Sequence, residues 1–194
     1  MNNLYYQLMK RFFDFSFAIF LIFALLFFII ISAILVKITS KGRALYWSDR
    51  VGKNNKIFKM PKFRSMLTGT PTVATHLLDN PDVYLSPIGG FLRSTSLDEL
   101  PQLFSVLKGD MSFVGPRPAL FNQEDLIALR KEKGVDKLLP GITGWAQVNG
   151  RDELSISDKN TLDVEYLNRQ SFWFDMKILW MTFLKVIKRD GVSH

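Results

Sequence analysis

The chain has 194 residues and a net charge of +7, and it contains no cysteine and only two histidines. Disulfides and thiolate metal sites are therefore excluded, and a histidine-based zinc site is not supported. The positive charge indicates an anionic partner, such as a phosphate-bearing ligand, an acidic lipid or a nucleic acid. Seventeen phenylalanines and four tryptophans are many for a soluble protein of this length, so we expect contact with a membrane.

The first element is an apolar run at residues 12–36, followed and preceded by basic residues. As one helix it would be about 37 Å long, enough to cross a hydrocarbon core of about 30 Å. Positive charge on both sides assigns no orientation, so the segment either spans the membrane or enters and returns on the cytoplasmic side. Asp14 near its start is predicted to be structural, paired with Lys10 or Arg11 one turn earlier.

Residues 44–66 predict two strands around a turn, because a glycine- and asparagine-rich turn separates them. Pro61 would make the second strand an edge or split it. This hairpin is basic, which indicates either a solvated face or a surface for lipid headgroups or substrate phosphates. Residues 67–90 predict a long irregular loop, of the kind that often acts as a lid or binding loop. The basic side chains of the hairpin are Lys53, Lys56, Lys59, Lys62 and Arg64.

An adjacent acidic pair, Asp98 and Glu99, lies between Arg93 and a proline-flanked Arg117. Apolar residues at helical spacing follow the pair as far as Gly109, which predicts a short helix. Carboxylates can hold a divalent cation or attack phosphorus, and arginines bind phosphate oxygens. Because a residue before proline is held in extended backbone, Arg117 has a rigid stem. The pattern therefore suggests a site for a phosphorylated substrate.

The acidic pair also has a structural interpretation. Asp98 is a good N-cap residue, and capping there would put Pro101 in the first turn of the helix. Ser96 with Glu99 fits a capping box instead, which places Pro101 deeper in the helix. From the pair alone, capping and chemistry both remain open.

Residues 122–134 predict a polar-faced helix. The following stretch, residues 139–151, is rich in glycine, which would allow close backbone approach to a ligand. Gln147 and Arg151 would supply polar contacts there. The alternative is an ordinary turn-rich connection.

Two further helices are predicted at residues 158–169 and 172–188. The second is amphipathic and framed by lysines. Its apolar stripe belongs either to the protein core or to an interfacial helix at a membrane surface. The stripe includes Trp173, Met176, Trp180, Phe183 and Ile187.

Three motifs stand in order at Ser94–Gln102 (STSLDELPQ), Gly109–Pro118 (GDMSFVGPRP) and Pro140–Arg151 (PGITGWAQVNGR). Together they resemble the bacterial sugar transferase family, the monotopic phosphoglycosyl transferases. The basic Lys62–Met66 segment and the Lys-Arg-x-x-Asp pattern at residues 10–14 fit the same family. The resemblance covers roughly residues 8–193.

The resemblance implies an α/β, mostly helical enzyme. Residues 1–40 would form a hydrophobic, re-entrant membrane helix. Residues 41–194 would form a catalytic domain at the cytoplasmic face, with a β-hairpin and amphipathic interfacial helices. The expected location is the inner, or cytoplasmic, membrane of a bacterium.

The implied reaction moves a sugar 1-phosphate from a UDP-sugar to polyprenyl (undecaprenyl) phosphate and releases UMP. It is the first membrane step of glycoconjugate synthesis. The resemblance makes Asp98 the nucleophile, which forms an aspartyl-phosphosugar intermediate, and makes Glu99 a ligand of Mg²⁺. The acidic pair Asp98 and Glu99 is thus both catalytic and metal-binding. The residues expected to bind phosphate or nucleotide sugar are Arg93, Arg117, Gln147 and Arg151.

The expected partners are the UDP-sugar donor, the polyprenyl phosphate acceptor and membrane lipid. No nucleic acid is expected, because the sequence carries no helix-turn-helix, RNP or zinc signature. The alternative function is a membrane-anchored basic scaffold or pseudoenzyme, in which Asp98 only caps a helix.

One feature departs from the family pattern. Family members usually carry a Ser-Pro pair midway through the apolar run, whereas Leu26 and Phe27 lie near that place here, and no proline occurs between residues 12 and 36. Sharp kinks usually trace to proline, glycine, serine or a local bulge. A re-entrant segment would therefore need another cause for its bend.

Overall fold

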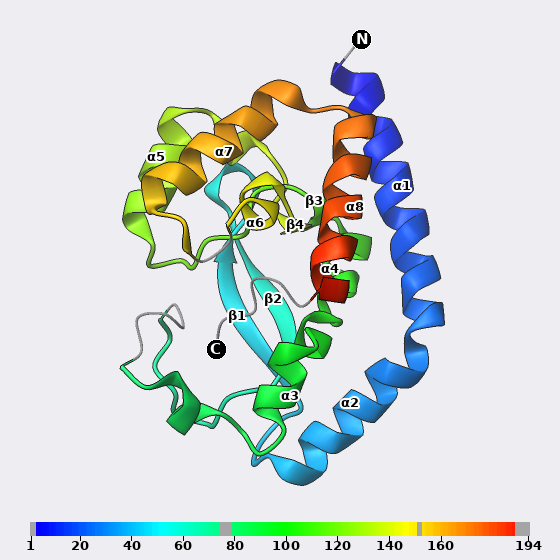
Figure 1. The fold of residues 1–194 in the computed structure, drawn as a ribbon, viewed down its shortest axis with the longest axis vertical. Helices are drawn as coiled ribbons and strands as arrows, with labels where there is room; N and C mark the ends of the chain where they lie inside the picture. Colours follow the sequence, from blue (N-terminus) through cyan, green and yellow to red (C-terminus); the bar gives the residue numbers. More distant parts are fainter. Residues whose placement is uncertain (1–2, 74–78, 151–152, 189–194) are drawn as a thin grey trace.

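The computed structural model describes residues 3–73, 79–150 and 153–188. It is mostly helical with two small two-stranded sheets, which confirms the predicted α/β class. In Figure 1 the N-terminal helices run down one side, the hairpin lies in the middle, and α5 and α7 cover the opposite upper corner.

The elements follow one another along the chain, with the longest connection between β2 and η3. They are α1 (Asn3–Ala24), α2 (Leu26–Thr39), β1 (Leu45–Val51), η1 (Lys53–Asn55), β2 (Ile57–Phe63), η3 (Pro81–Tyr84), α3 (Gly89–Ser94), η4 (Leu97–Glu99), α4 (Gln102–Lys108), β3 (Ser112–Val114), α5 (Glu124–Glu132), η5 (Val135–Lys137), β4 (Gly141–Thr143), α6 (Trp145–Val148), α7 (Ile156–Arg169) and α8 (Phe172–Lys188), where η marks a 3-10 turn.

The apolar N-terminal segment forms two helices, α1 and α2, bent by 64°. Among the described residues no single helix is long and apolar enough to cross a membrane, although the bent pair together meets that requirement in length and composition. The segment is therefore not one straight helix, and a bent pair is compatible with the re-entrant alternative as well as with a broken span. The break lies at Leu25, whose φ of −102° and ψ of 8° leave the helical region. It needs neither proline nor glycine.

Tertiary packing accounts for the bend, because the two arms pack against different parts of the protein. Ala18 of α1 is fully buried in the main core, and Arg11 donates to the carbonyls of Val106 and Leu107 in α4 at 2.6 and 2.7 Å. Val36 of α2 is buried in a second cluster, with β2 and α3. A straight helix would lose one of these contacts. The predicted domain boundary after residue 40 falls just beyond α2, and the division into two domains stays a prediction.

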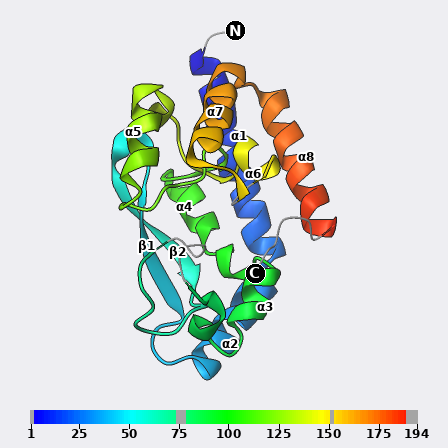
Figure 2. The ribbon, with the colours of Figure 1, turned by 60° about the vertical axis from the view of Figure 1, so that its left-hand side comes forward.

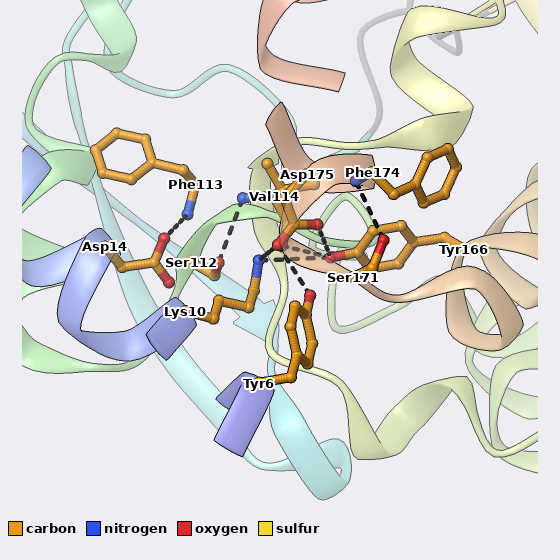
Figure 3. A network of polar contacts seen from close by, with 10 residues as sticks. All are labelled: Tyr6, Lys10, Asp14, Ser112, Phe113, Val114, Tyr166, Ser171, Phe174 and Asp175. Carbon is orange, nitrogen blue, oxygen red and sulfur yellow. Dashed lines mark hydrogen bonds and ion pairs between the residues drawn. The ribbon is translucent and has the colours of Figure 1, made fainter. Parts of the chain in front are cut away.

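A buried polar network joins α1 to α8 and β3 (Figure 3). Asp175 accepts hydrogen bonds from Tyr6 at 2.9 Å, from Lys10 at 2.6 Å and from Tyr166 at 2.7 Å. The Asp14 carboxylate accepts the Phe113 N–H at 3.2 Å. Asp14 is thus structural, and the positive charge of Lys10 acts on it as expected, although the Lys10 ammonium makes its ion pair with Asp175 and Arg11 binds α4 carbonyls.

Strands β1 and β2 form the predicted antiparallel hairpin. Pro61 lies opposite Trp47 in a two-stranded sheet, where every strand is an edge, so it does not split β2. Asn54 and Asn55 adopt the left-handed conformation in the turn, with φ of 55° and 58°. The predicted irregular loop contains η3, and a bridge between Met66 and Leu85 closes its base.

The predicted short helix is α4, and it ends as expected at Gly109, whose φ is 93°. The capping interpretations are wrong. Pro101 occupies the N-cap position of α4, and no side chain caps this helix. Asp98 and Glu99 lie one turn earlier, in η4, and the Ser96 side chain makes no capping bond there.

Strands β3 and β4 form a parallel pair that lies beside α6 (Figure 1). Its backbones approach so closely that only glycine fits. A Cβ on Gly141 would lie 2.2 Å from the Gly115 nitrogen, and one on Gly144 would lie 2.1 Å from the Gly115 oxygen. Gly141 and Gly144 thus allow close contact between two chain segments, and Gly141 also lines the small pocket that contains Glu99. The approach of this stretch to a ligand stays a prediction.

Figure 2 shows α5 and α8 on opposite sides of the upper part of the molecule, with α7 between them. These elements confirm the three predicted downstream helices. In α8 the buried side is formed by Phe174 and Ile178. The predicted apolar stripe faces outward instead: Trp173 is 80% exposed and Trp180 is 60% exposed. Its assignment to the core is therefore wrong, which leaves the interfacial interpretation.

Candidate active site

The acidic pair lies at a strained turn between α3 and α4. Ser96 precedes it in the left-handed conformation, with a φ of 56°, which is uncommon for a residue other than glycine, asparagine or aspartate. Asp98 is buried, with 7% of its surface exposed. Backbone strain of this kind persists only where the surrounding structure enforces it, and it concentrates at functional sites.

Glu99 faces two cations from distant parts of the chain. Its Oε1 lies 2.7 Å from Lys62 Nζ on β2 and 3.8 Å from Nη2 of Arg117. The Lys62 and Glu99 side chains are both 17% exposed. The hairpin therefore brings a basic side chain to the acidic pair, so Lys62 does not belong to a solvated face, and contact of the hairpin with substrate phosphates or lipid headgroups stays a prediction.

The environment of Asp98 opposes its ionisation. Burial raises the pKa of Asp98 to about 6, the positive charge of Lys62 lowers it, the negative charge of Glu99 raises it, and Arg93 lowers it. The carboxylate is therefore charged above pH 6 without being fully compensated. Arg93, in the last turn of α3, is close enough for its charge to act on Asp98, and its expected binding of phosphate stays a prediction.

Arg50 of β1 is a site residue that the sequence did not reveal. It shares a small pocket with Glu99, between the hairpin, α4 and the Arg117 segment. Burial lowers the pKa of Arg50 to about 10, with a further lowering by the charge of Arg117 and an opposing effect of Glu99. It stays protonated at neutral pH. The pocket is lined by Arg50, Met60, Lys62, Glu99, Gln102, Arg117, Pro118, Gly141 and Ile142.

The remaining predicted residues are distributed unevenly. Gln147 donates from Nε2 to the carbonyl of Ile142, a pocket residue, at 3.2 Å, and its Oε1 is buried without a partner. Gln147 thus contacts the pocket wall through the backbone. Arg151 lies outside the described residues. The structure brings together Asp98, Glu99, Arg93 and Arg117, and adds Lys62 and Arg50.

The acidic pair provides few metal ligands. Within the described residues there is no cluster of three or more histidine, cysteine or acidic side chains. Asp98 and Glu99 alone suit a cation that keeps several waters and takes its other ligands from substrate phosphates. Mg²⁺ binds in this way, commonly through one or two carboxylates. The donor set fits the expected metal.

Comparisons with known proteins agree with this geometry. The family model described as bacterial sugar transferase matches residues 5–189. The chain is 40% identical over 190 residues to the uncharacterized sugar transferase EpsL of Bacillus subtilis, covering 97% of this chain and 92% of EpsL. It is 39% identical over 199 residues to the undecaprenyl-phosphate glucose phosphotransferase of Komagataeibacter xylinus, covering 97% of this chain and 37% of that protein.

A third relative is the UDP-glucose:undecaprenyl-phosphate glucose-1-phosphate transferase of Escherichia coli K12, with 42% identity over 161 residues. This match covers 79% of the chain and 34% of the relative. The chain thus spans nearly all of EpsL but only about a third of the two relatives with named activities. The chain belongs to the bacterial sugar transferase family, so the predictions of this family and of a transferase enzyme are confirmed.

Proposed function

We propose that the protein transfers a sugar 1-phosphate from a UDP-sugar to a polyprenyl phosphate and releases UMP. The observation that carries the proposal is a buried carboxylate, Asp98, surrounded by basic side chains from separate elements. Lys62 and Arg93 act on it directly, and Arg117 contacts the neighbouring Glu99. Relatives that match most of this chain are named as undecaprenyl-phosphate phosphotransferases of glucose or galactose, which supports the acceptor class and the type of group transferred.

In the first step an Asp98 carboxylate oxygen attacks the sugar-bearing phosphorus of the donor. A bond forms between this oxygen and phosphorus, the bond from phosphorus to the oxygen it shares with UMP breaks, and UMP leaves. The product on the protein is an aspartyl-phosphosugar. In the second step a phosphate oxygen of the polyprenyl phosphate attacks the same phosphorus. This displaces Asp98 and yields a polyprenyl-diphosphate sugar.

The protein's own residues supply what the attack requires. A carboxylate is a weak nucleophile, so its activation depends on surroundings that do not fully stabilise its charge. Burial of Asp98 provides such surroundings. Lys62, Arg93 and Arg117 offer fixed positive charge for the donor phosphates as negative charge develops on them. Glu99 and Asp98 would hold Mg²⁺, which would make the phosphorus more electrophilic when bound.

The acceptor requires an active site at a membrane surface, because a polyprenyl chain stays in the lipid. The bent pair of α1 and α2 and the exposed tryptophans of α8 support this placement. We propose that α1 and α2 enter and leave the same face of a bacterial inner membrane. The catalytic part would then lie on the cytoplasmic side, where UDP-sugars are made.

The first experiment measures UMP release from a panel of UDP-sugars, including UDP-glucose and UDP-galactose, with undecaprenyl phosphate and Mg²⁺. We expect release with at least one donor, and a fall of about 1000-fold or more in Asp98→Asn, since the nucleophile is lost. Asp110→Asn is a matched control, because Asp110 forms a surface ion pair with Lys108 away from the site. UMP release by Asp98→Asn at the wild-type rate would reject Asp98 as the nucleophile.

Two further measurements distinguish an enzyme from the scaffold alternative and test whether turnover requires Mg²⁺. With donor alone, the wild-type chain should gain the mass of one phosphosugar and Asp98→Asn should gain none. EDTA should abolish UMP release, and added Mg²⁺ should restore it. A wild-type protein that releases no UMP from any donor would favour the membrane-anchored scaffold or pseudoenzyme. Full turnover in EDTA would remove the metal from the mechanism.

A further inference from the structure

The segment that carries Arg117 is anchored through four consecutive backbone carbonyls. The donors come from three different elements. They are the Gly141 N–H to Pro116 O at 2.9 Å, Arg130 Nη1 to Arg117 O at 2.8 Å, Arg50 Nη1 to Pro118 O at 3.1 Å, and the Val51 N–H to Ala119 O at 2.9 Å.

The sequence explains why the carbonyls are used. Pro116 and Pro118 have no N–H, so the segment around Arg117 has few donors with which to join a ladder. Its position must therefore be fixed by groups that donate to it. Two of the four anchors are arginine side chains, which means that ordinary substitutions can test them.

Arg130 is built to hold this position. Its Nε and Nη2 donate to Oδ2 of Asp163 on α7 at 3.0 and 2.6 Å, which leaves Nη1 directed at the Arg117 carbonyl. The Arg130 side chain is 12% exposed and that of Asp163 is 2% exposed. A planar guanidinium can serve both partners at once, whereas a lysine ammonium lacks the fork geometry.

Arg130 is remote from the chemistry itself. It does not line the small pocket that contains Glu99 and Arg117, and its three named contacts are to Asp163 and to a backbone carbonyl. Arg50, by contrast, lies in that pocket and also bonds the Ser48 hydroxyl at 3.0 Å. Any effect of Arg130 on turnover must therefore pass through the segment it holds.

We infer that Arg130, held by Asp163, is a positioning residue that keeps the Arg117 guanidinium aligned with Glu99 and the donor phosphates. Arg50 holds the next carbonyl and is the second anchor of the same device. This inference rests on the proposed function, because it assigns Arg117 to the phosphates of the donor. It extends the site to α5 and α7, which contribute no residue to the pocket.

A double-mutant cycle tests the inference. UMP release is measured for the wild type, Arg130→Lys, Arg117→Ala and the double variant, with whichever of UDP-glucose, UDP-galactose or the other UDP-sugars the wild type uses. We expect Arg130→Lys to lower kcat/KM by about tenfold in the wild-type background, a change that corresponds to about 1.4 kcal/mol. In the Arg117→Ala background the same substitution should change kcat/KM less than twofold.

Melting temperatures separate this outcome from a loss of folding. Asp163→Asn serves as the second variant, with the same expected cycle, in case Arg130→Lys does not fold. Arg169→Lys is the matched control: Arg169 is also an arginine paired with a carboxylate of α7, Glu165, but its guanidinium lies over the Trp145 and Phe174 rings instead of on the Arg117 segment. It should leave kcat/KM unchanged.

The possible results lead to different conclusions. Equal losses from Arg130→Lys in both backgrounds would overturn the positioning role and leave the proposed function intact. A wild-type protein that releases no UMP from any donor would overturn the proposed function, and this inference with it. A loss of turnover from Arg130→Lys in the wild type, but not in Arg117→Ala, would establish Arg130 as a positioning residue.

Discussion

At the scale of single residues, Asp98 meets two opposing requirements. Burial keeps water from the carboxylate and raises its pKa to about 6, which disfavours its charged form. The nearby Lys62 and Arg93 only partly offset this effect. A group whose charged form is disfavoured in the folded protein lowers the stability of that protein when it ionises. The proposed nucleophile is therefore a source of instability.

We accordingly expect Asp98→Asn to raise the melting temperature at pH 7.5. The folded pKa lies above the usual value near 4, so the wild type loses stability as pH rises from about 4 through 6, and the neutral amide does not. The difference should be roughly 2–3 kcal/mol at pH 7.5 and should vanish below pH 4. Thermal unfolding of both proteins across this pH range measures it. An asparagine variant that is less stable at pH 7.5 would contradict the assignment.

The sequence predicted part of this site and missed the rest for a physical reason. Asp98, Glu99 and Arg93 are close in sequence, and the prolines around Arg117 mark it by themselves. Lys62 is one of several basic residues in the hairpin, and only the folded packing of β2 against η4 shows that it meets Glu99. That Lys62, and no other basic residue of the hairpin, is paired with Glu99 therefore could not be predicted from the sequence.

At the scale of elements, the bend between α1 and α2 shows that packing can replace proline. Leu25 N–H still bonds Leu21 O at 2.8 Å, and Ile29 N–H bonds Leu25 O at 2.9 Å, so the break is confined to less than one turn. Each arm is held by its own cluster of buried side chains. The conformation at Leu25 follows from where the two arms must go.

A proline scan should locate this break. Leu26 is the first residue of α2, where a helix N–H has no partner in its own helix, so proline there removes no hydrogen bond of α2, although it would push Leu25 toward extended backbone. We expect Leu26→Pro to destabilise the protein less than a proline inside α2. Ile30→Pro should cost about 3 kcal/mol or more, because it lies within the helix. Both side chains are exposed apolar residues of α2, so tryptophan-fluorescence melts in detergent compare like with like.

Similar melting temperatures for the two proline variants would show that the helix does not break at Leu25.

The elements themselves were predicted unequally well. The helices α4, α7 and α8 could be predicted from the spacing of their apolar residues and from the residues at their ends, because this information lies within each segment. The β3–β4 pair was missed, because each strand has only three residues and their pairing depends on the close approach of Gly115 and Gly141.

At the scale of the whole molecule, the distribution of exposed apolar side chains supports a membrane-bound arrangement. It covers α1, α2 and the outer face of α8, where Trp173, Trp180 and Phe183 are exposed. In Figure 1 α8 runs beside the upper part of α1. A surface of this kind would be expensive in water and suits the interface of a bilayer.

The proposed re-entrant topology places residues 3 and 41 on the same side of the membrane. The chain contains no cysteine, so single cysteines in Asn3→Cys and Lys41→Cys can be labelled without background. In intact cells of a bacterium expressing the protein, we expect a membrane-impermeant maleimide to label neither. Both should react after the cells are opened. Labelling of the Asn3→Cys protein in intact cells would instead indicate a helix pair that crosses the membrane.

The contacts of Arg11 and Lys10 have a consequence for anyone who wishes to obtain the catalytic part alone. These two residues of α1 neutralise the carbonyl end of α4 and the buried Asp175, and Ala18 fills part of the main core. Deleting the first 40 residues would leave a buried carboxylate without its cation and open that core to solvent. The apolar N-terminal segment is thus part of the packed interior of the enzyme. A more polar version of the protein would have to replace only the exposed apolar side chains of α1 and α2 and keep the buried ones.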